Sequence, residues 1–257
     1  MSSAADDRAD VFDARRLSFG GAAELYDRAR PSYPPEAARW MLGEEPLHVV
    51  DLGSGTGKFA RVLAALGHEV VAVDPDPGMR ERLAEAMPDV VALAGSAEAI
   101  PLADASADAV VAAQSFHWFD TGEARAEIAR VLRPGGILAP IWNVRDDSVA
   151  WVAELSRRVL EGDPSAGDRA AHVEFGPLFE AAARAEFRHA DEHSAVSLLE
   201  LVQSRSKYLI ASEQERHRMD AGVEAVTAGL PVRFELPYVA VAFRAVRARP
   251  TLDSGRP

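Results

Sequence analysis

The sequence predicts an α/β protein whose core is a doubly wound, mostly parallel sheet with helices on both faces. Short apolar runs typical of buried strands alternate with amphipathic stretches typical of helices, and a glycine-rich turn follows the first strand. A chain of 257 residues with a hydrophobic fraction of 48% is large enough for one domain with a sizeable core.

Five apolar segments are the predicted parallel strands. Each is short, rich in aliphatic residues and bounded by polar or turn-forming residues, as expected of strands buried on both faces. A sixth segment near the end of the chain alternates in hydrophobicity, and we expect it to insert antiparallel near an edge. The five parallel strands span 47–52, 69–73, 90–94, 109–113 and 137–141, and the alternating segment spans 238–246.

The intervening segments carry helix signals. An apolar stripe from Phe59 to Leu66 faces the sheet, and Gly67 follows where a left-handed residue ends a helix. Asp76 and Pro77 are typical of an N-cap followed by a first-turn proline. Further helices are expected over 123–132, 148–160, 198–210 and 213–228.

Composition excludes several classes of protein. The chain contains no cysteine, which removes disulfides, thiolate nucleophiles and thiolate zinc sites. A formal net charge of −12 disfavours nucleic acid as a partner, because phosphate binding depends on Lys and Arg. No apolar run approaches the ~18 residues of a membrane helix, and the acidic N-terminus is not a secretory signal. We therefore expect a cytoplasmic protein with no membrane partner.

The pattern predicts one domain over residues 18–247. Its core spans 45–145, and 146–247 form a helical insertion followed by closing strands. Residues 1–17 are predicted to be a flexible leader, and 248–257, which contain two prolines and a glycine, a flexible tail.

The first strand-to-helix turn has the composition of a ligand-binding loop. Gly53, Gly55 and Gly57 follow Asp51 at the strand end, so a ligand can approach the backbone and the free N–H groups of the next helix. A dinucleotide fingerprint needs glycine at position 58, where Lys58 stands, and no P-loop motif occurs. A tight structural turn remains the alternative.

The second strand ends in an acid, Asp74. This residue lies about 20 residues beyond the glycine loop, where an acid accepts hydrogen bonds from both ribose hydroxyls. The alternative is a surface acid that caps the next helix. With the glycine loop upstream, ribose binding is the better interpretation.

Four motifs together resemble one family. They are D-L-G-S-G-T-G-K at 51–58, V-D-P-D-P-G-M at 73–79, G-S-A-E-A-I-P-L at 95–102 and V-L-R-P-G-G at 131–136. The set resembles the class I S-adenosyl-L-methionine (SAM) dependent methyltransferases of the small-molecule "type 11" group. Residues 26–34 are similar to a bacterial subset related to trans-aconitate methyltransferase. The resemblance implies a seven-stranded, Rossmann-like sheet with an antiparallel edge hairpin and extra C-terminal helices.

The resemblance also implies where the cofactor SAM would bind. The three loop glycines would line its methionine part with Asp51 below them, Asp74 would hold the ribose, and Ser96 and Ala97 would meet the adenine. Many relatives carry aspartate where Ser96 stands, so the adenine contact is weaker here. The candidate cofactor-binding residues are Tyr26, Arg30, Asp51, Gly53, Ser54, Gly55, Gly57, Asp74, Pro75, Met79, Ser96, Ala97, Glu98, Gln114 and Ser115.

The exit of the fourth strand is unusually aromatic. Phe116, His117 and Trp118 would border the sulfonium and the acceptor, since aromatic faces attract a cation. Alternatively, these rings only fill the end of the sheet. These three residues and Tyr33 are the candidate substrate-binding residues. His117 is the candidate catalytic base, although methyl transfer often needs only alignment of the nucleophile.

Two other groups of residues invite weaker interpretations. The segment with Tyr26, Arg30 and Tyr33 is either a lid, with Arg30 near the methionine carboxylate or an acidic substrate, or an ordinary amphipathic helix. His189 and His193 lack a third ligand in register, so no metal site is predicted. The acids that follow His189, Asp191-Glu192, are predicted to lie in a solvated loop.

The sequence therefore predicts a SAM-dependent methyltransferase that acts on an O, N or C nucleophile of a small molecule by direct displacement, as a monomer or homodimer. Two alternatives remain open. One is an NAD(P)-dependent oxidoreductase on a related fold, and the other is a non-catalytic SAM-binding protein.

Overall fold

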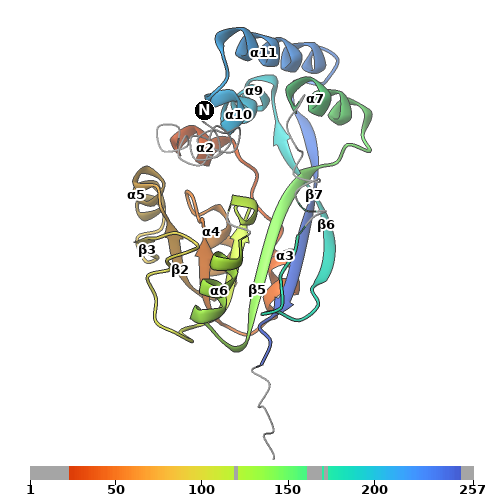
Figure 1. The fold of residues 1–257 in the computed structure, drawn as a ribbon. Helices are drawn as coiled ribbons and strands as arrows, with labels where there is room; N and C mark the ends of the chain where they lie inside the picture. Colours follow the sequence, from red (N-terminus) through yellow and green to blue (C-terminus); the bar gives the residue numbers. More distant parts are fainter. Residues whose placement is uncertain (1–22, 119–120, 161–169, 171–172, 250–257) are drawn as a thin grey trace, which may run out of the picture.

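The fold of the computed structural model is a seven-stranded sheet with helices on both faces (Figure 1). The structure describes residues 23–118, 121–160, 170 and 173–249. The predicted leader and nearly all of the predicted tail lie outside these residues. The strand order is β3-β2-β1-β4-β5-β7-β6.

Six strands run in one direction and β7 opposes them. β1 pairs in parallel with β2 and β4, β2 with β3, and β4 with β5, whereas β7 pairs antiparallel with both β5 and β6. The doubly wound parallel sheet and its antiparallel edge hairpin are thus confirmed. The strands are β1 (His48–Leu52), β2 (Glu69–Asp74), β3 (Val91–Ala94), β4 (Ala107–Ala113), β5 (Leu132–Arg145), β6 (Ala183–His193) and β7 (Phe234–Val246).

Helices pack on the two faces through separate apolar clusters. On one face α3 (Pro35–Leu42) and α4 (Lys58–Ala65) bury residues such as Met41 and Phe59 against odd-numbered residues of β1, β4 and β5. On the other face α6 (Gly122–Val131) packs Ile128 against residues that include Trp142. α5 (Pro77–Ala86) contacts β2 and β3, and Asp76 caps it by accepting from the amide of Met79, as predicted.

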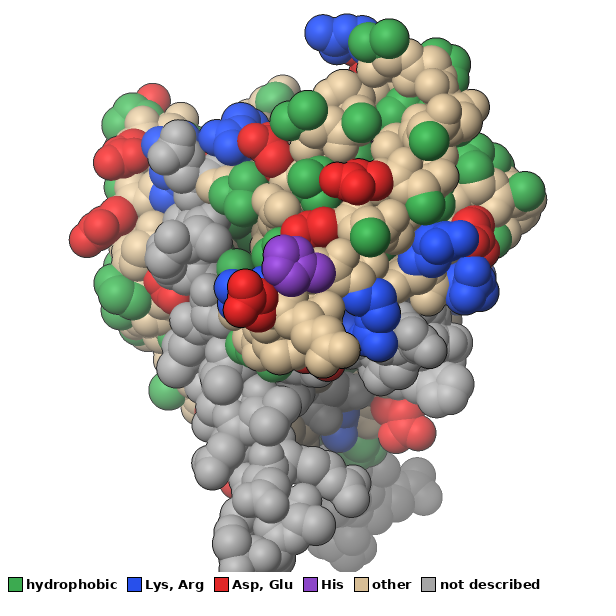
Figure 2. All heavy atoms as spheres, turned by 90° about the horizontal axis from the view of Figure 1, so that it is seen from above, with side chains coloured by type: hydrophobic (Ala, Val, Ile, Leu, Met, Phe, Trp, Pro, Cys, Tyr) green, Lys and Arg blue, Asp and Glu red, His purple; other side chains and the backbone are tan. Residues whose placement is uncertain are grey.

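The remaining helices form a cap at one end of the sheet, seen at the top of Figure 1. Their apolar cluster includes Leu155, Leu198 and Val223, and it reaches the start of β7 at Leu236 and Tyr238. Viewed from above, acidic and basic side chains of the described residues are interspersed over this face (Figure 2). The cap helices are α2 (Ala23–Ala29), α7 (Ala150–Leu160), α9 (Ala195–Gln203), α10 (Ser206–Leu209) and α11 (Glu213–Thr227).

Two local predictions were wrong. The acids Asp191-Glu192 lie within β6, not in a solvated loop. β6 is an edge strand that is mostly exposed or half-buried, so it lacks the apolar run that marks a buried strand. The single helix expected over 198–210 is instead two helices, α9 and α10, separated by Ser204 and Arg205. Arg205 has an extended backbone, and the side chain of Arg30 donates hydrogen bonds to both the hydroxyl and the carbonyl of Ser204.

The fifth strand is also longer than predicted, since it begins at Leu132 and includes the V-L-R-P-G-G turn residues. The register of β4 against β5 shifts between Ala107 and Ala109, which accommodates those residues. No helix in the described part of the chain is long and apolar enough to cross a bilayer.

Candidate functional site

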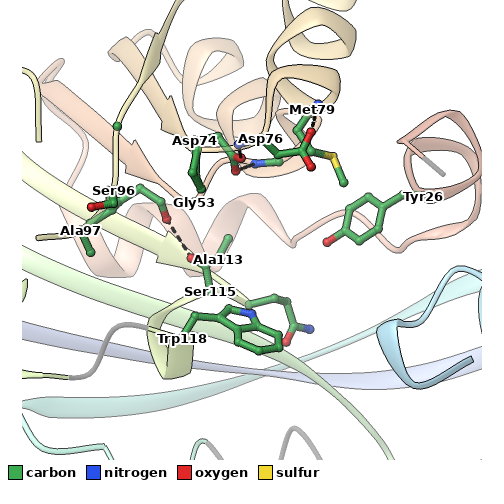
Figure 3. Close-up of a pocket in the computed structure, with 15 residues that line it drawn as sticks. Tyr26, Gly53, Asp74, Asp76, Met79, Ser96, Ala97, Ala113, Ser115 and Trp118 are labelled. Atoms are coloured by element: carbon green, nitrogen blue, oxygen red, sulfur yellow. Dashed lines mark hydrogen bonds between the residues drawn. The ribbon is translucent and has the colours of Figure 1, made fainter. Parts of the chain in front are cut away.

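A pocket lies at the carboxyl ends of β1, β2 and β4, where ligands bind in doubly wound sheets (Figure 3). It encloses roughly 700 Å³ of space, its open mouth included. Its walls come from the glycine loop, the ends of the second to fourth strands and the cap helix α2. The lining residues are Tyr26, Leu52, Gly53, Gly55, Asp74, Pro75, Asp76, Met79, Gly95, Ser96, Ala97, Ala113, Gln114, Ser115 and Trp118.

The glycine loop requires its glycines. Gly53, Gly55 and Gly57 have φ values of 66°, 54° and 81°, a left-handed conformation that is costly for residues with a Cβ. The amides of Gly53 and Ser54 both donate to the carbonyl of Val73, which ties the loop to β2. The backbone therefore faces the pocket without intervening side chains at Gly53 and Gly55.

Asp74 is held rigidly at the end of β2. One carboxylate oxygen accepts from the amide of Gly55 at 2.8 Å, and the other accepts from the amide of Asp76 at 2.9 Å. Burial raises the pKa of Asp74, while these two amides oppose the shift. Each oxygen keeps acceptor capacity for a ligand hydroxyl.

Asp51 lies beneath the loop rather than in the pocket wall. Its side chain is fully buried, and burial together with the charge of Asp74 raises its pKa to about 7, against the opposing amide of Ala60. A carboxyl with such a pKa carries part of a charge near neutral pH and so favours a cationic ligand group above it.

The end of β4 is strained where it meets the pocket. Gln114 has a φ of 61°, which is uncommon for a residue with a side chain. Its side-chain amide donates to the carbonyl of Asn143, and the hydroxyl of Ser115 donates to the carbonyl of Leu52. These bonds hold the strained segment, and such strain clusters at ligand sites.

The aromatic strand exit divides between core and pocket. Phe116 is 1% exposed and stacks on Phe175, so it fills the end of the sheet as the alternative interpretation proposed. Trp118 lines the pocket. His117 is half-buried behind it, and its Nδ1 accepts from the indole N–H of Trp142 at 3.4 Å.

Helix α2 connects the pocket to the cap. Tyr26 points into the pocket (Figure 3), and the next residue, Asp27, accepts from the hydroxyl of Thr56 at 2.9 Å and from Arg61. Although burial works against it, these hydrogen bonds hold the pKa of Asp27 below its usual value. Arg30 lies over the ring of Tyr26 but directs its hydrogen bonds to Ser204 of the cap.

The pocket brings together most of the predicted cofactor residues, with some exceptions. Glu98 is exposed, and Tyr33 is buried against Phe59. The predicted residues outside the lining are Arg30, Asp51, Ser54, Gly57 and Glu98 for the cofactor, and Tyr33, Phe116 and His117 for the substrate.

The lining adds residues that the motifs alone did not assign, among them Gly95 and Asp76. A Cβ at position 95 would fall 2.6 Å from Pro101, so the structure requires glycine there. In the sequence, the signal was a glycine directly after the third predicted strand. The part of the chain that the structure describes holds no group of three or more potential metal ligands.

Comparisons with known proteins agree with this geometry. A family model described as a methyltransferase domain matches residues 50–139. An uncharacterized methyltransferase of Mycobacterium tuberculosis is 43% identical over 238 residues, covering 90% of this chain and 96% of that protein. An uncharacterized methyltransferase of Schizosaccharomyces pombe is 36% identical, covering 80% of this chain and 85% of its own.

A solved structure from Anaeromyxobacter dehalogenans, provisionally named a type II methyltransferase, has 27% identity and a TM-score of 0.62, covering 86% of this chain and 99% of its own. Fold and comparisons thus define a doubly wound methyltransferase with a pocket at the carboxyl ends of its strands. The chain belongs to the class I SAM-dependent methyltransferases.

Proposed function

We propose that this methyltransferase moves the methyl group of SAM to an O, N or C nucleophile of a small molecule by direct displacement. The observation that carries the proposal is that the strained Gln114–Ser115 segment and Trp118 share one pocket with the glycine loop and Asp74. A cofactor held by the loop would place its reactive end beside residues that also border an acceptor. The cap over this end of the sheet favours a small acceptor.

The residues present fit SAM. Backbone at Gly53 and Gly55 is open to close approach, and the fixed carboxylate of Asp74 can accept from two hydroxyls. Ser96 and Ala97 form the wall where the adenine would lie, and the indole of Trp118 suits a sulfonium cation. When bound, SAM supplies the electrophilic methyl group.

His117 is better placed to shape the acceptor site than to remove a proton. Because the indole N–H of Trp142 can only donate, the Nδ1 of His117 must be the acceptor, so a neutral ring carries its proton on Nε2. In that tautomer the ring has no spare lone pair for a base. The enzyme would then contribute mainly orientation and a desolvated pocket.

One relative narrows the chemistry further. A malonyl-[acyl-carrier protein] O-methyltransferase of Methylococcus capsulatus is 37% identical over 134 residues, which is about half of each chain. The match makes an oxygen acceptor one reasonable test case. It does not extend over the whole cap.

The proposal is tested by cofactor binding and turnover. We expect SAM and S-adenosylhomocysteine to bind in the micromolar range by calorimetry and to raise the melting temperature by linkage, with no response to NAD. A response to NAD and none to SAM would favour the oxidoreductase alternative. SAM binding without formation of S-adenosylhomocysteine on any small acceptor would favour a non-catalytic SAM-binding protein.

A further inference from the structure

A second group of polar side chains lies beneath the cap, beside the cofactor pocket. Arg145 of β5, Tyr238 of β7 and His189 of β6 stand directly opposite one another in the sheet, so they share one face. His193, at the end of β6, lies on that face too. We call Arg145, Tyr238, His189 and His193 the cap-side cluster.

Arg145 is buried without a carboxylate partner. Its side chain is 8% exposed, and its one hydrogen bond to a described residue is a long contact of 3.5 Å to the hydroxyl of Ser156. Its Nη2 is buried and makes no hydrogen bond to the part of the chain that the structure describes. The hydroxyl of Ser156, which Arg145 contacts, donates in turn to the carboxylate of Asp147, and Asp147 makes no hydrogen bond to the guanidinium itself. A buried charge left in this way is costly unless something pairs with it.

The groups around Arg145 could also bind an anion. His193 is 6% exposed, its Nδ1 contacts the hydroxyl of Ser197, and its Nε2 is buried without a partner. Tyr238 is buried, and its ring stacks on that of His189. Burial raises the pKa of Tyr238 to about 12, so its hydroxyl keeps its proton and can donate.

Charges of both signs act on the cluster. Arg30 and Arg205 face Tyr238 from the cap, and Asp191 faces Tyr238 and both histidines from β6. Two further acids act on the cluster, Asp147 on Arg145 and Glu36 on His189. With three acids nearby, the cluster suits one negative charge that pairs with the Arg145 guanidinium better than the two charges of a phosphate.

Asn143 of β5 connects the cluster to the pocket: its Oδ1 contacts the Nε2 of His189 at 2.9 Å, although none of the four cluster residues lines the pocket. Gln114 lines the pocket, and its side chain donates to the carbonyl of Asn143 on β5. Arg145 lies two residues further along the strand on the same face as Asn143, a step of about 7 Å. A molecule that extends from Gln114 to Arg145 would pass the buried side chain of Asn143.

We propose that the methyl acceptor carries a carboxylate, which Arg145 binds together with the Tyr238 hydroxyl and His193. This inference rests on the proposed function and adds the chemical class of the acceptor. The planar guanidinium matches a planar carboxylate in a two-bond contact. The carboxylate anchors the acceptor under the cap while another part of it lies at the methyl group.

The test uses protein saturated with S-adenosylhomocysteine and defined probes. Succinate and benzoate are titrated beside succinamide and benzamide, with inorganic phosphate as a third arm, by calorimetry and by the side-chain NMR signals of His193. We expect at least one acid to bind and to shift His193, its amide to be inert, and phosphate to bind more weakly. The carboxylate assignment is wrong if neither acid binds or if phosphate binds more tightly.

Two variants distinguish a specific role of Arg145 in acid binding from a general effect of removing one positive charge. Arg145→Gln is expected to weaken acid binding at least about tenfold and to leave the affinity for S-adenosylhomocysteine unchanged. The matched control is Arg184→Gln, an exposed arginine on β6, which should bind the acids like the parent. If Arg145→Gln binds the acid as tightly as the parent does, the proposal is wrong. If the parent itself does not bind S-adenosylhomocysteine, the proposed function is wrong instead.

A stability measurement distinguishes an anion site from a structural arginine. Arg145→Met removes a buried charge that has no partner, so without probe its melting temperature should equal or exceed that of the parent. The binding acid should then raise the melting temperature of the parent and not that of the variant. A clearly lower melting temperature of Arg145→Met would show that Arg145 is structural.

Discussion

The pocket at the ends of β1 to β4 and the cap-side cluster on β5, β7 and β6, which belong to the two halves of the sheet, differ in the kinds of groups that form them. At the ends of β1 to β4 the pocket is lined by left-handed glycines and by short segments that directly follow these strands. Between β5 and β6 the cap-side cluster consists of long side chains brought together by pairing of distant strands. If both proposals hold, the backbone of the first site suits one cofactor, whereas single side-chain replacements in the second would change its ligand.

The largest effect is expected for Asp74→Ala, because the carboxylate of Asp74 lines the pocket and is the proposed acceptor for the ribose hydroxyls. Each lost charge-assisted hydrogen bond is worth about 1.5–3 kcal/mol, so SAM should bind at least tenfold more weakly by calorimetry. The exposed acid Asp104 supplies the control Asp104→Ala. Unchanged affinity in a folded Asp74→Ala variant would show that the ribose lies elsewhere.

A medium effect is expected for Asp51→Asn, which concerns stability without cofactor. Because folding raises the pKa of Asp51 to about 7, the native state holds its proton more tightly than the unfolded chain. The carboxyl therefore contributes stability below the unfolded pKa near 3.8, and this contribution is lost as pH rises to about 7. Above that pH the variant should be more stable than the parent by about 1–3 kcal/mol.

Denaturant titrations across this pH range provide the measurement. The difference between parent and variant should shrink toward acid pH, where both side chains are neutral. A constant difference at all pH values would contradict the assigned titration of Asp51.

The smallest effect is expected for His117→Gln at the border between the two halves. If the ring shapes the acceptor site, glutamine should retain most of kcat and change mainly the KM of the acceptor, with SAM binding intact. A catalytic base would instead lose about 10²-fold or more in kcat. Steady-state kinetics at saturating acceptor decide between the two roles.

The difference between the halves also explains what could be predicted from sequence. The glycine loop, Asp74 and the strands β1 to β4 are marked by local signals, namely apolar runs, glycine spacing and an N-cap at Asp76. The parallel core and the antiparallel segment at β7 were therefore predicted from the residues, whereas the edge hairpin with β6 followed only from the family resemblance. The residue roles within the cofactor pocket stay predictions, although the structure gathers most of them in one place.

The cap-side cluster had no local signal. β6 alternates polar and small residues along an exposed edge, so neither its strand state nor the partners of His189 and His193 followed from the sequence. Arg145 lies beyond the predicted fifth strand, 137–141, and contacts Tyr238 only because β5 pairs with a segment more than ninety positions away. Long-range pairing of this kind is invisible to motif spacing.

Because β6 and β7 pair continuously, the length of the segment that connects them determines which residues of β7 face the cap-side cluster. The two strands pair without a bulge from Ala183–Arg244 to His193–Phe234. A deletion of one residue in the turn before Phe234 that slipped this register would turn Tyr238 to the opposite face of the sheet. Insertions and deletions between α11 and β7 are thus as consequential for this enzyme as substitutions at Arg145 itself.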